Sequence, residues 1–292
     1  MLELRKRLRR FVPLSLVAIK THYLHHGAWP RIFNPKTFNE KICYRKIFDH
    51  RAIWKQFADK YAVRDYVEQR VGPGILPRLF HVTQNPANIP FDALPNKFVV
   101  KPTHGCSWVR LIDDNAQIDR EALIAECNGW LNQSYYELTR EWQYKDITPR
   151  IVVEEFIDDE SGDAPIDYKF MAFDGTVRVI HAPKNRFSVQ KVTCYDRCWN
   201  KLDVLGIADG VHAVVEDVPW PDRLDEMILT AETLGRGIDF VRVDLYATKN
   251  KVYFGELTVT PTNGAIRYEP VEFDLYLGQL WDVKRMTEPS VS

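Results

Sequence analysis

Two short strands near the end of the chain, joined by a loop at residues 249–251, predict a β-hairpin with charged residues on one face. Because side chains alternate across a strand, Arg242 and Asp244 share a face, and so do Glu256 and Thr258 on the returning strand. With the loop at this position, Asp244 stands opposite Glu256 and Arg242 stands opposite Thr258. The hairpin therefore places two carboxylates side by side.

Like charges opposite one another in an antiparallel pair destabilise it by roughly 0.2–1 kcal/mol. A divalent cation reverses this effect, and Mg2+ prefers carboxylate oxygens together with substrate phosphates and water. The pattern thus predicts a magnesium site with Asp244, Glu256 and Thr258 as ligands, beside which Arg242 could bind a phosphate through two hydrogen bonds. A solvated hairpin face, with the pairing shifted by a residue or two, accounts for the same sequence.

Length and charge limit the classes of protein to consider. The chain has 292 residues, 45% of them hydrophobic, which is enough for one large domain or two smaller ones with a substantial core. Its 39 basic residues nearly balance its 40 acidic ones. We therefore expect no nucleic-acid partner on the basis of charge.

The cysteines indicate the compartment. There are five of them, an odd number that forms no complete disulfide framework, and no secretory signal precedes them. This predicts a reducing, cytoplasmic location. Cys194 and Cys198 lie four residues apart, but no second cysteine pair or spaced histidine pair completes a zinc site.

The first 20 residues interleave basic and apolar side chains. This basic amphipathic pattern predicts peripheral contact with the anionic inner face of a membrane. A helix docked on its own domain predicts the same residues. Since no run of 18 or more apolar residues occurs in the sequence, we expect no spanning helix. The basic residues of this segment are Arg5, Lys6, Arg7, Arg9 and Arg10.

Periodicity and turn residues predict a mixed α+β chain. Apolar residues recur at helical intervals through much of the first 70 residues, whereas β-branched runs alternate with turns further on. The Asp174-Gly175 pair predicts a type I′ hairpin turn. The main expected elements are a strand at 98–101, a helix at 119–133, a strand at 151–157, the hairpin at 166–182 and a helix at 221–235.

Several weaker signals suit a nucleotide. A strand ends at Lys101 and runs into the small-residue loop 103–107, which offers an ammonium group and backbone N–H donors to phosphate oxygens. Asp167 and Lys169 share one face of their strand. A tight turn with a solvated lysine, and an exposed ion pair worth under about 1 kcal/mol, account for the same residues. No P-loop or G-x-G-x-x-G motif occurs in the sequence.

The order of these signals resembles the ATP-grasp superfamily, and within it the TupA-like branch associated with teichuronic acid and other cell-surface polysaccharides. The resemblance runs from about Pro35 to Gly264. Its most diagnostic pieces are Thr37-Phe38-Asn39-Glu40-Lys41, Ala58-Asp59-Lys60-Tyr61, Asp167-Tyr168-Lys169-Phe170 and Gly255-Glu256-Leu257-Thr258.

The resemblance implies an α+β ATP-grasp fold in which two α+β subdomains clamp a nucleotide after an N-terminal helical region. That region is expected at residues 1–58, and the catalytic region at 59–283. Within the latter we expect a lid subdomain at about 97–156 and a metal-binding subdomain at about 157–283.

The resemblance also implies roles for individual residues. ATP and one or two Mg2+ are the implied cofactors, the second Mg2+ less securely because Thr258 stands where most of the family has asparagine. The implied nucleotide-binding residues are Lys60 and Lys101, the phosphate flap His104, Gly105, Cys106 and Ser107, the adenine hinge Glu154, Glu155, Phe156 and Ile157, Asp167 at the ribose and Lys169 at a phosphate. The implied catalytic residues are Arg242 and Lys169, and the implied metal ligands are Asp244, Glu256 and Thr258.

The implied activity is an ADP-forming ligation that joins a carboxylate to an amine through an acyl phosphate. The expected substrates are an amino acid or uronate and a glycan precursor. His181, Lys184 and Arg186, just past the Asp-Gly hairpin, are candidates to meet an anionic acceptor, although surface basic residues are usually only solvated. A kinase acting on a sugar hydroxyl and a non-catalytic nucleotide-binding protein are the alternatives.

Overall fold

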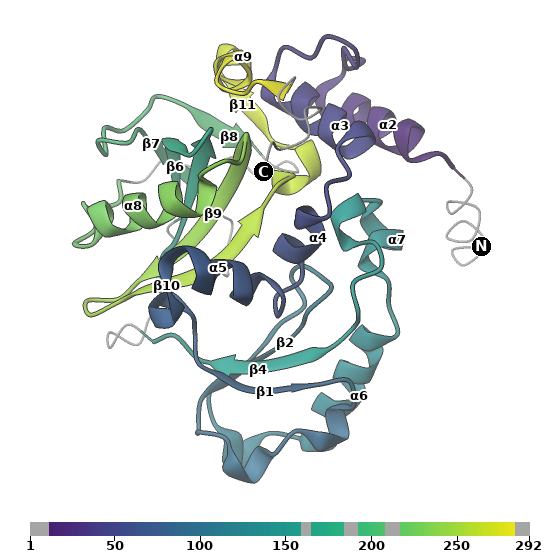
Figure 1. Ribbon diagram of the computed structural model, residues 1–292, viewed down its shortest axis with the longest axis vertical. Helices are drawn as coiled ribbons and strands as arrows, with labels where there is room; N and C mark the ends of the chain where they lie inside the picture. Colours follow the sequence, from purple (N-terminus) through teal and green to yellow (C-terminus); the bar gives the residue numbers. More distant parts are fainter. Residues whose placement is uncertain (1–11, 159–164, 184–191, 208–216, 284–292) are drawn as a thin grey trace. The chain divides into compact units, whose positions relative to one another are not determined.

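The chain folds into two compact units. The computed structural model describes residues 12–158, 165–183, 192–207 and 217–283. The first unit combines residues 1–51 with 166–292, and the second spans residues 52–165 (Figure 1). Both units contain helices and antiparallel strands, so the predicted α+β class is confirmed.

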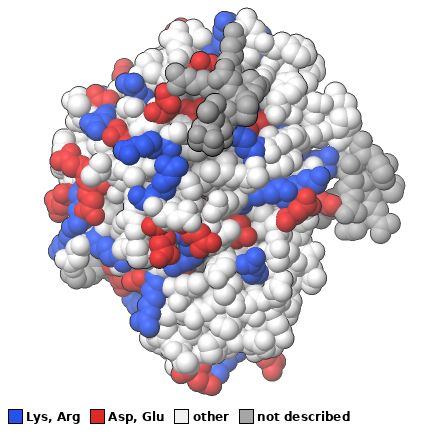
Figure 2. All heavy atoms as spheres, in the orientation of Figure 1, with Lys and Arg blue, Asp and Glu red and all other residues white. Residues whose placement is uncertain are grey.

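The surface charges and the hydropathy of the helices can be examined directly in the structure. On the face shown in Figure 2, basic side chains are interspersed with acidic ones. None of the helices in the described ranges is long and apolar enough to cross a membrane.

The first unit is built on a five-stranded antiparallel sheet in the order β10-β9-β5-β6-β7. The helix α8 (Leu224–Gly235) packs on one face, where Gly235 contacts Ala172 and Val241. The strands are β5 (Asp167–Phe173), β6 (Thr176–Pro183), β7 (Val192–Tyr195), β9 (Phe240–Ala247) and β10 (Val252–Thr258). The predicted Asp-Gly hairpin is confirmed, since Asp174 and Gly175 both have positive φ, at 49° and 72°, between β5 and β6.

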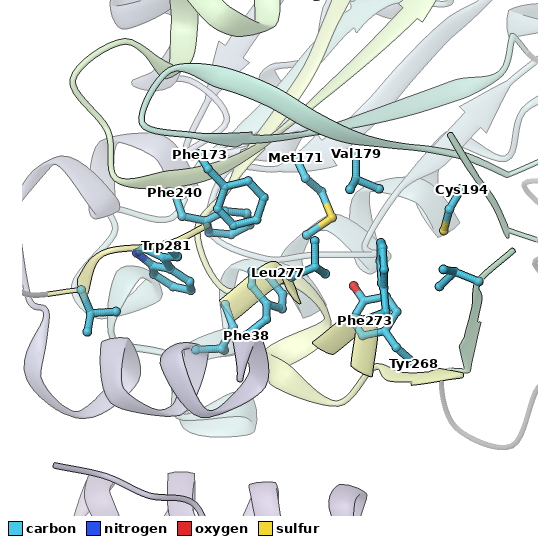
Figure 3. Packing of buried hydrophobic residues seen from close by; sticks show 13 residues of the cluster. Phe38, Met171, Phe173, Val179, Cys194, Phe240, Tyr268, Phe273, Leu277 and Trp281 are labelled. Atoms are coloured by element: carbon cyan, nitrogen blue, oxygen red, sulfur yellow. The ribbon is translucent and has the colours of Figure 1, made fainter. Parts of the chain in front are cut away.

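The opposite face of this sheet carries the main apolar core at one end. Phe173 of β5 and Phe240 of β9 are paired in the sheet and point toward Phe38 and Trp281 (Figure 3). The covering elements are α3 (Phe38–Phe48), α9 (Glu272–Gln279) and the two-stranded sheet of β8 (Leu205–Ile207) and β11 (Arg267–Glu269). The core therefore joins segments that lie about 200 residues apart in the sequence.

Local capping marks the ends of the two N-terminal helices. Thr37 caps α3 by accepting from the Glu40 backbone N–H, and the Glu40 side chain accepts from the Thr37 N–H in return. The preceding helix α2 (Leu14–His26) ends at Gly27, which has a φ of 69°. Val17, Ala18 and His22 form the buried side of α2, and α2 packs against α3.

The second unit contains a four-stranded antiparallel sheet in the order β1-β4-β2-β3. Its strands are β1 (Leu79–Thr83), β2 (Phe98–Pro102), β3 (Arg110–Ile112) and β4 (Ile151–Glu155). Its helices are α4 (Ile53–Ala58), α5 (Val63–Val71), α6 (Arg120–Leu131) and α7 (Tyr135–Thr139). The helix expected at 119–133 is α6, and Asp119 caps it, because its carboxylate accepts from the Ala122 N–H.

The two units do not follow the divisions expected from the sequence at residues 58 and 97. Helix α3 belongs with the C-terminal sheet, since Phe38 and Ile42 lie in the same core as Phe240. The divisions expected from the family resemblance therefore stay predictions about functional regions.

A buried arginine fixes α3 to the sheet of the first unit. Arg45, with its side chain 1% exposed, donates to the carbonyls of Phe240 at 2.8 Å and Val259 at 3.0 Å and pairs with Asp239 at 2.5 Å. Burial alone would raise the pKa of Asp239, but Arg45 and Arg51 together lower it below its usual value. The ion pair thus links α3 to the ends of β9 and β10.

Replacing Arg45 with alanine is expected to destabilise the protein by about 3–5 kcal/mol, because Asp239 loses its buried partner and two carbonyls lose their donor. Arg51, which also pairs with Asp239 but is 33% exposed, provides the matched control, and Arg51→Ala should cost about 1 kcal/mol or less. Urea unfolding of both variants measures the difference. Equal losses would contradict a special role for the buried group.

Candidate functional site

The β9–β10 hairpin brings the predicted acidic residues together. Glu256 pairs with Asp244 and Thr258 pairs with Arg242, as the sequence predicts. The pairing close to the turn differs from the predicted one. Tyr253 pairs with Tyr246 there, whereas the predicted alignment pairs Tyr246 with Phe254. A β-bulge between Phe254 and Glu256 restores it.

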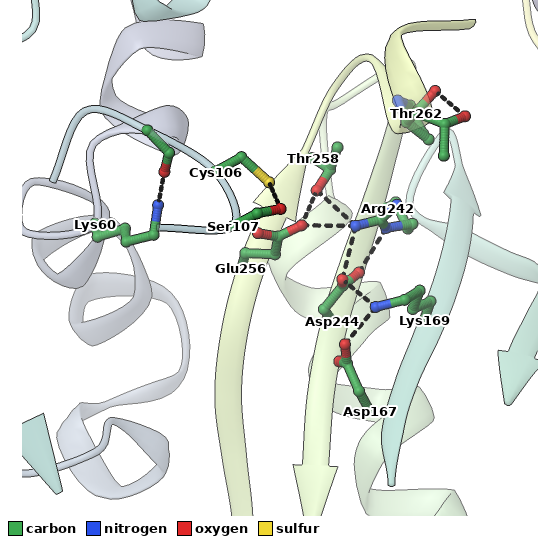
Figure 4. Close-up of polar contacts among 12 residues, drawn as sticks. Lys60, Cys106, Ser107, Asp167, Lys169, Arg242, Asp244, Glu256, Thr258 and Thr262 are labelled. Carbon is green, nitrogen blue, oxygen red and sulfur yellow. Dashed lines mark hydrogen bonds and ion pairs between the residues drawn. The ribbon is translucent and has the colours of Figure 1, made fainter. Parts of the chain in front are cut away.

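Arg242 lies at the centre of the polar cluster on this hairpin (Figure 4). Its Nε and Nη2 donate to the two oxygens of Asp244 at 2.7 and 2.8 Å, and Nη2 also donates to Glu256 Oε1 at 2.6 Å and Thr258 Oγ1 at 3.1 Å. The Thr258 hydroxyl in turn donates to Glu256 Oε1 at 2.7 Å. One guanidinium group therefore neutralises the repulsion that the sequence predicts between the two carboxylates.

Lys169 joins the cluster from the neighbouring strand. Paired with Asp244 across β5 and β9, it donates from Nζ to Asp244 Oδ2 at 2.9 Å and also to Asp167. The predicted Asp-x-Lys pair on β5 thus belongs to the same network as the hairpin and is not an isolated exposed ion pair. The network contains three carboxylates and two cationic groups, which leaves one negative charge in excess.

Burial controls protonation within this cluster. It raises the pKa of Asp244 to about 6, against the opposing effects of Arg242 and Lys169. Burial would lower the pKa values of Arg242 and Lys169, but the Asp244, Glu256 and Asp167 carboxylates together outweigh it, and both pKa values are raised. Asp244 therefore takes up a proton as the pH falls through about 6.

The donor set suits an open magnesium site rather than a closed one. Both Asp244 and Glu256 offer carboxylate oxygens within hydrogen-bond reach of the same Arg242 nitrogen, and the excess negative charge favours a cation. Across the described ranges, no three His, Cys, Asp or Glu residues are grouped so as to hold a metal ion. The Asp244 and Glu256 carboxylates fit a cation that also takes phosphate and water ligands, because Mg2+ binds through one or two carboxylates together with substrate phosphates. The role of Thr258 as a metal ligand stays a prediction, because in this structure its hydroxyl donates to Glu256.

The polar row continues past Lys169 to a buried histidine. His181 of β6 pairs with Lys169 on one side and with Cys194 of β7 on the other, so that all three share a face of the sheet. Burial, Arg242 and Lys169 lower the pKa of His181 to about 3. Its Nε2 is buried and has no hydrogen-bond partner among the described residues. The imidazole is therefore neutral, which differs from the basic group expected to meet an anionic acceptor. Lys184 and Arg186, predicted with it, lie outside the described residues.

The second unit holds the predicted phosphate-binding lysines. Lys101 of β2 forms an ion pair with the buried Glu154 of β4. Lys60 donates its backbone N–H to the Thr103 carbonyl at 3.1 Å and its Nζ to the Gly105 carbonyl. Both lysines thus lie beside the predicted phosphate loop or the predicted hinge within this unit.

The loop at 103–107 depends on close packing. A Cβ atom at Gly105 would lie 2.4 Å from the ring of Trp108, so only glycine fits there. His104 is buried, and its Nε2 lies 3.1 Å from the carbonyls of Trp130 and Gln133. Burial lowers the pKa of His104, which makes it a neutral donor that anchors the loop. Cys106 and Ser107 follow, with the Cys106 Sγ 3.7 Å from the Ser107 Oγ.

The predicted hinge follows the end of β4. Glu155 is the last residue of the strand, and its carboxylate accepts from the Arg78 N–H at 2.9 Å. Phe156 and Ile157 follow it in irregular structure, with Lys97 lying 5.5 Å above the Phe156 ring. The adenine-binding role of residues 154–157 stays a prediction.

One strained stretch beside the hairpin was not predicted. Thr262, Asn263 and Gly264 all have positive φ, at 47°, 57° and 75°, and such a conformation is unusual for threonine. His26 of α2 hydrogen-bonds to the Gly264 carbonyl at 2.8 Å. The Asn-Gly pair was the signal in the sequence for this turn.

Binding of Mg2+ with ATP should weaken as the pH falls through about 6, because a protonated Asp244 cannot act as a ligand. The ratio of wild-type affinity to that of Asp244→Asn should be largest above this pH and fall about tenfold per unit below it. Calorimetric titrations of both proteins from pH 5 to 8 measure the ratio. The titration of ATP itself is common to both proteins and cancels. A ratio that does not change with pH would rule out this carboxylate as the titrating group.

Comparison with solved structures gives distant similarities to ligases. An L-amino acid ligase from Bacillus licheniformis is 17% identical, with a TM-score of 0.46 over 72% of this chain and 44% of that one. A D-alanine–D-alanine ligase from Bacillus anthracis, complexed with ATP, is 17% identical, with a TM-score of 0.39 over 70% and 54%. The enzyme of that name from Helicobacter pylori is 17% identical, with a TM-score of 0.43 over 78% and 62%. The chain spans about half the length of the first two of these proteins.

Comparison with curated proteins gave no match. The family comparison is decisive, because the TupA-like ATP-grasp family matches residues 40–282, more than four fifths of the chain. This range includes every described residue of the polar cluster and of the two lysine sites. The chain belongs to the TupA-like ATP-grasp family.

Proposed function

We propose that the protein is an ATP-dependent ligase that joins a carboxylate to an amine in the synthesis of a cell-surface polysaccharide. The observation that carries this proposal is the cluster in which Arg242 and Lys169 hold Asp244 and Glu256 on one face of the sheet. Such a set can bind phosphate oxygens and a cation together. Membership of the TupA-like ATP-grasp family supports ATP as the phosphoryl donor.

Each residue of the cluster has a role in this reaction. The Arg242 guanidinium can transfer hydrogen bonds from the carboxylates to the oxygens of the transferred phosphoryl group, since its donors are planar and always charged. Lys169 can bind a phosphate oxygen as a point charge from the adjacent strand. Asp244 and Glu256 would then be free to hold Mg2+, which neutralises charge on the phosphates when bound. The acyl phosphate formed on the substrate carboxylate is attacked by the amine, so that an amide, ADP and phosphate result.

The proposal also assigns nucleotide binding to residues of the second unit. Lys60 and Lys101 would bind phosphate oxygens, residues 103–107 would cover them, and residues 154–157 would contact the adenine. We propose an amino acid or a uronate as the carboxylate substrate and a sugar precursor as its partner. The cytoplasm, on the inner side of the membrane, is the proposed location.

Glu256→Gln and Asp244→Asn are each expected to lower turnover by about a hundredfold or more, because several kcal/mol of charge stabilisation on the transferred group are lost. Glu272, an exposed carboxylate on α9, supplies the control, and Glu272→Gln should leave turnover unchanged. Release of ADP in a coupled assay, with circular dichroism to confirm folding, gives the comparison. Full activity of either cluster variant in Mg2+ would refute its role.

Product analysis distinguishes a ligase from a kinase. The protein is incubated with ATP, Mg2+ and a panel of amino acids, uronic acids and amino sugars, and the products are separated by mass spectrometry. An amide formed together with ADP and free phosphate is the expected result. Phosphate retained on the acceptor would establish a kinase instead, and binding of ATP with no product from any pair would favour a non-catalytic nucleotide-binding protein.

A further inference from the structure

The outer face of α2 carries large apolar side chains that the described residues of its unit leave exposed. Leu16, Lys20, Tyr23 and Leu24 follow one another at helical spacing on the side opposite to the buried residues of this helix. Leu16 is 56% exposed and Leu24 is 68% exposed. A helix that only covered its own domain would present polar residues here.

The loop after α2 extends this exposed apolar character. The Trp29 ring stacks on Tyr23 with centroids 4.4 Å apart and is nevertheless 67% exposed, and Phe33 is 93% exposed. Large aromatic side chains at such exposure are characteristic of surfaces that contact a partner or a lipid interface. We call the set Leu16, Tyr23, Leu24, Trp29 and Phe33 the α2 surface.

The chain segment that carries the α2 surface contains more basic than acidic residues. Between Val12 and Phe48 the only acidic residue in the sequence is Glu40. Glu40 is buried, and its carboxylate accepts hydrogen bonds from the Arg31 side chain and from the N–H groups of Lys36 and Thr37. Lys20, Arg31 and Lys36 are exposed. The region over α2, at the upper right of Figure 2, is mostly white, with no gathering of acidic side chains.

The sequence just before α2 adds to this charge, because five basic residues occur between positions 5 and 10. Exposed leucine and aromatic groups together with clustered lysine and arginine are the features of a helix that lies in a membrane interface. An acidic protein surface would use the charges but would not require the exposed tryptophan, phenylalanine and leucines together.

We propose that the α2 surface binds a membrane that contains anionic lipid, with α2 lying in the interface. This goes beyond the ligase proposal and does not depend on it, since it requires neither ATP nor a sugar. It would hold the enzyme where a lipid-linked substrate is presented.

The test is co-sedimentation of the full chain with vesicles of equal parts phosphatidylcholine and phosphatidylglycerol, without nucleotide. Leu24→Glu should weaken binding by about tenfold, because an exposed leucine that would enter the lipid interface is replaced by a charge that anionic lipid repels. Leu229 on α8, which is 65% exposed, is the matched control, and Leu229→Glu should bind as the wild type does. Trp29→Ser and Trp220→Ser form a second matched pair, Trp220 being 57% exposed.

Binding to phosphatidylcholine alone should be much weaker, and added salt should weaken the binding to anionic vesicles. The proposal is overturned if the wild type does not sediment with anionic vesicles, or if Leu24→Glu and Leu229→Glu lose binding equally. It is also overturned if gel filtration shows a dimer that Leu24→Glu dissociates while no vesicle binding is found. Because ADP release is measured separately, failure of this proposal is distinguishable from failure of the ligase proposal.

Discussion

The Arg242 guanidinium makes the polar cluster of the first unit possible. Asp244 and Glu256 face each other across two paired strands, and without a cation between them they would repel each other. Arg242 contacts both carboxylates, and Lys169 contacts Asp244 from the next strand. Since these cations do not fully balance the three acids of the network, the site keeps an attraction for a further positive charge. A cation that entered would share the carboxylates with Arg242.

The polar cluster and the apolar core lie on the same face of the sheet, and the core holds the strands that carry the cluster. On β9, Phe240 points into the core and Arg242, two residues later, begins the cluster. On β5, Lys169 lies in the cluster, and Met171 and Phe173, which follow it on the same face, lie in the core. Strands that are fixed at one end by packed aromatic rings hold their polar ends in a defined register. The buried Arg45 adds hydrogen bonds at the end of β9 where the core begins. The geometry of the site thus depends on residues from α3, about 200 positions away.

Much of the site could be predicted from local sequence. The alternation of side chains placed Arg242 with Asp244 on one face, and the Asp-Gly pair fixed the neighbouring hairpin, because both signals act over a few residues. The partners of the carboxylates could not be predicted, since hydrogen bonds from Arg242 and Lys169 depend on side-chain conformations and on a strand 75 positions away. The neutral state of His181 was also missed, because only the packed structure reveals its burial.

The register of the hairpin shows how a correct prediction can rest on an incomplete reason. The pairing near the turn, continued without interruption, would place Glu256 opposite Val243, whose face of β9 is the one that packs against α8. The bulge at Gly255 turns Glu256 to the face of Asp244 instead. A Cβ atom at residue 255 would lie 2.9 Å from the Asp244 carbonyl oxygen and from the Tyr246 ring, so this close approach requires glycine. The acidic pair therefore depends on Gly255 as well as on the two carboxylates, because the bulge at this glycine determines on which face of the sheet Glu256 lies.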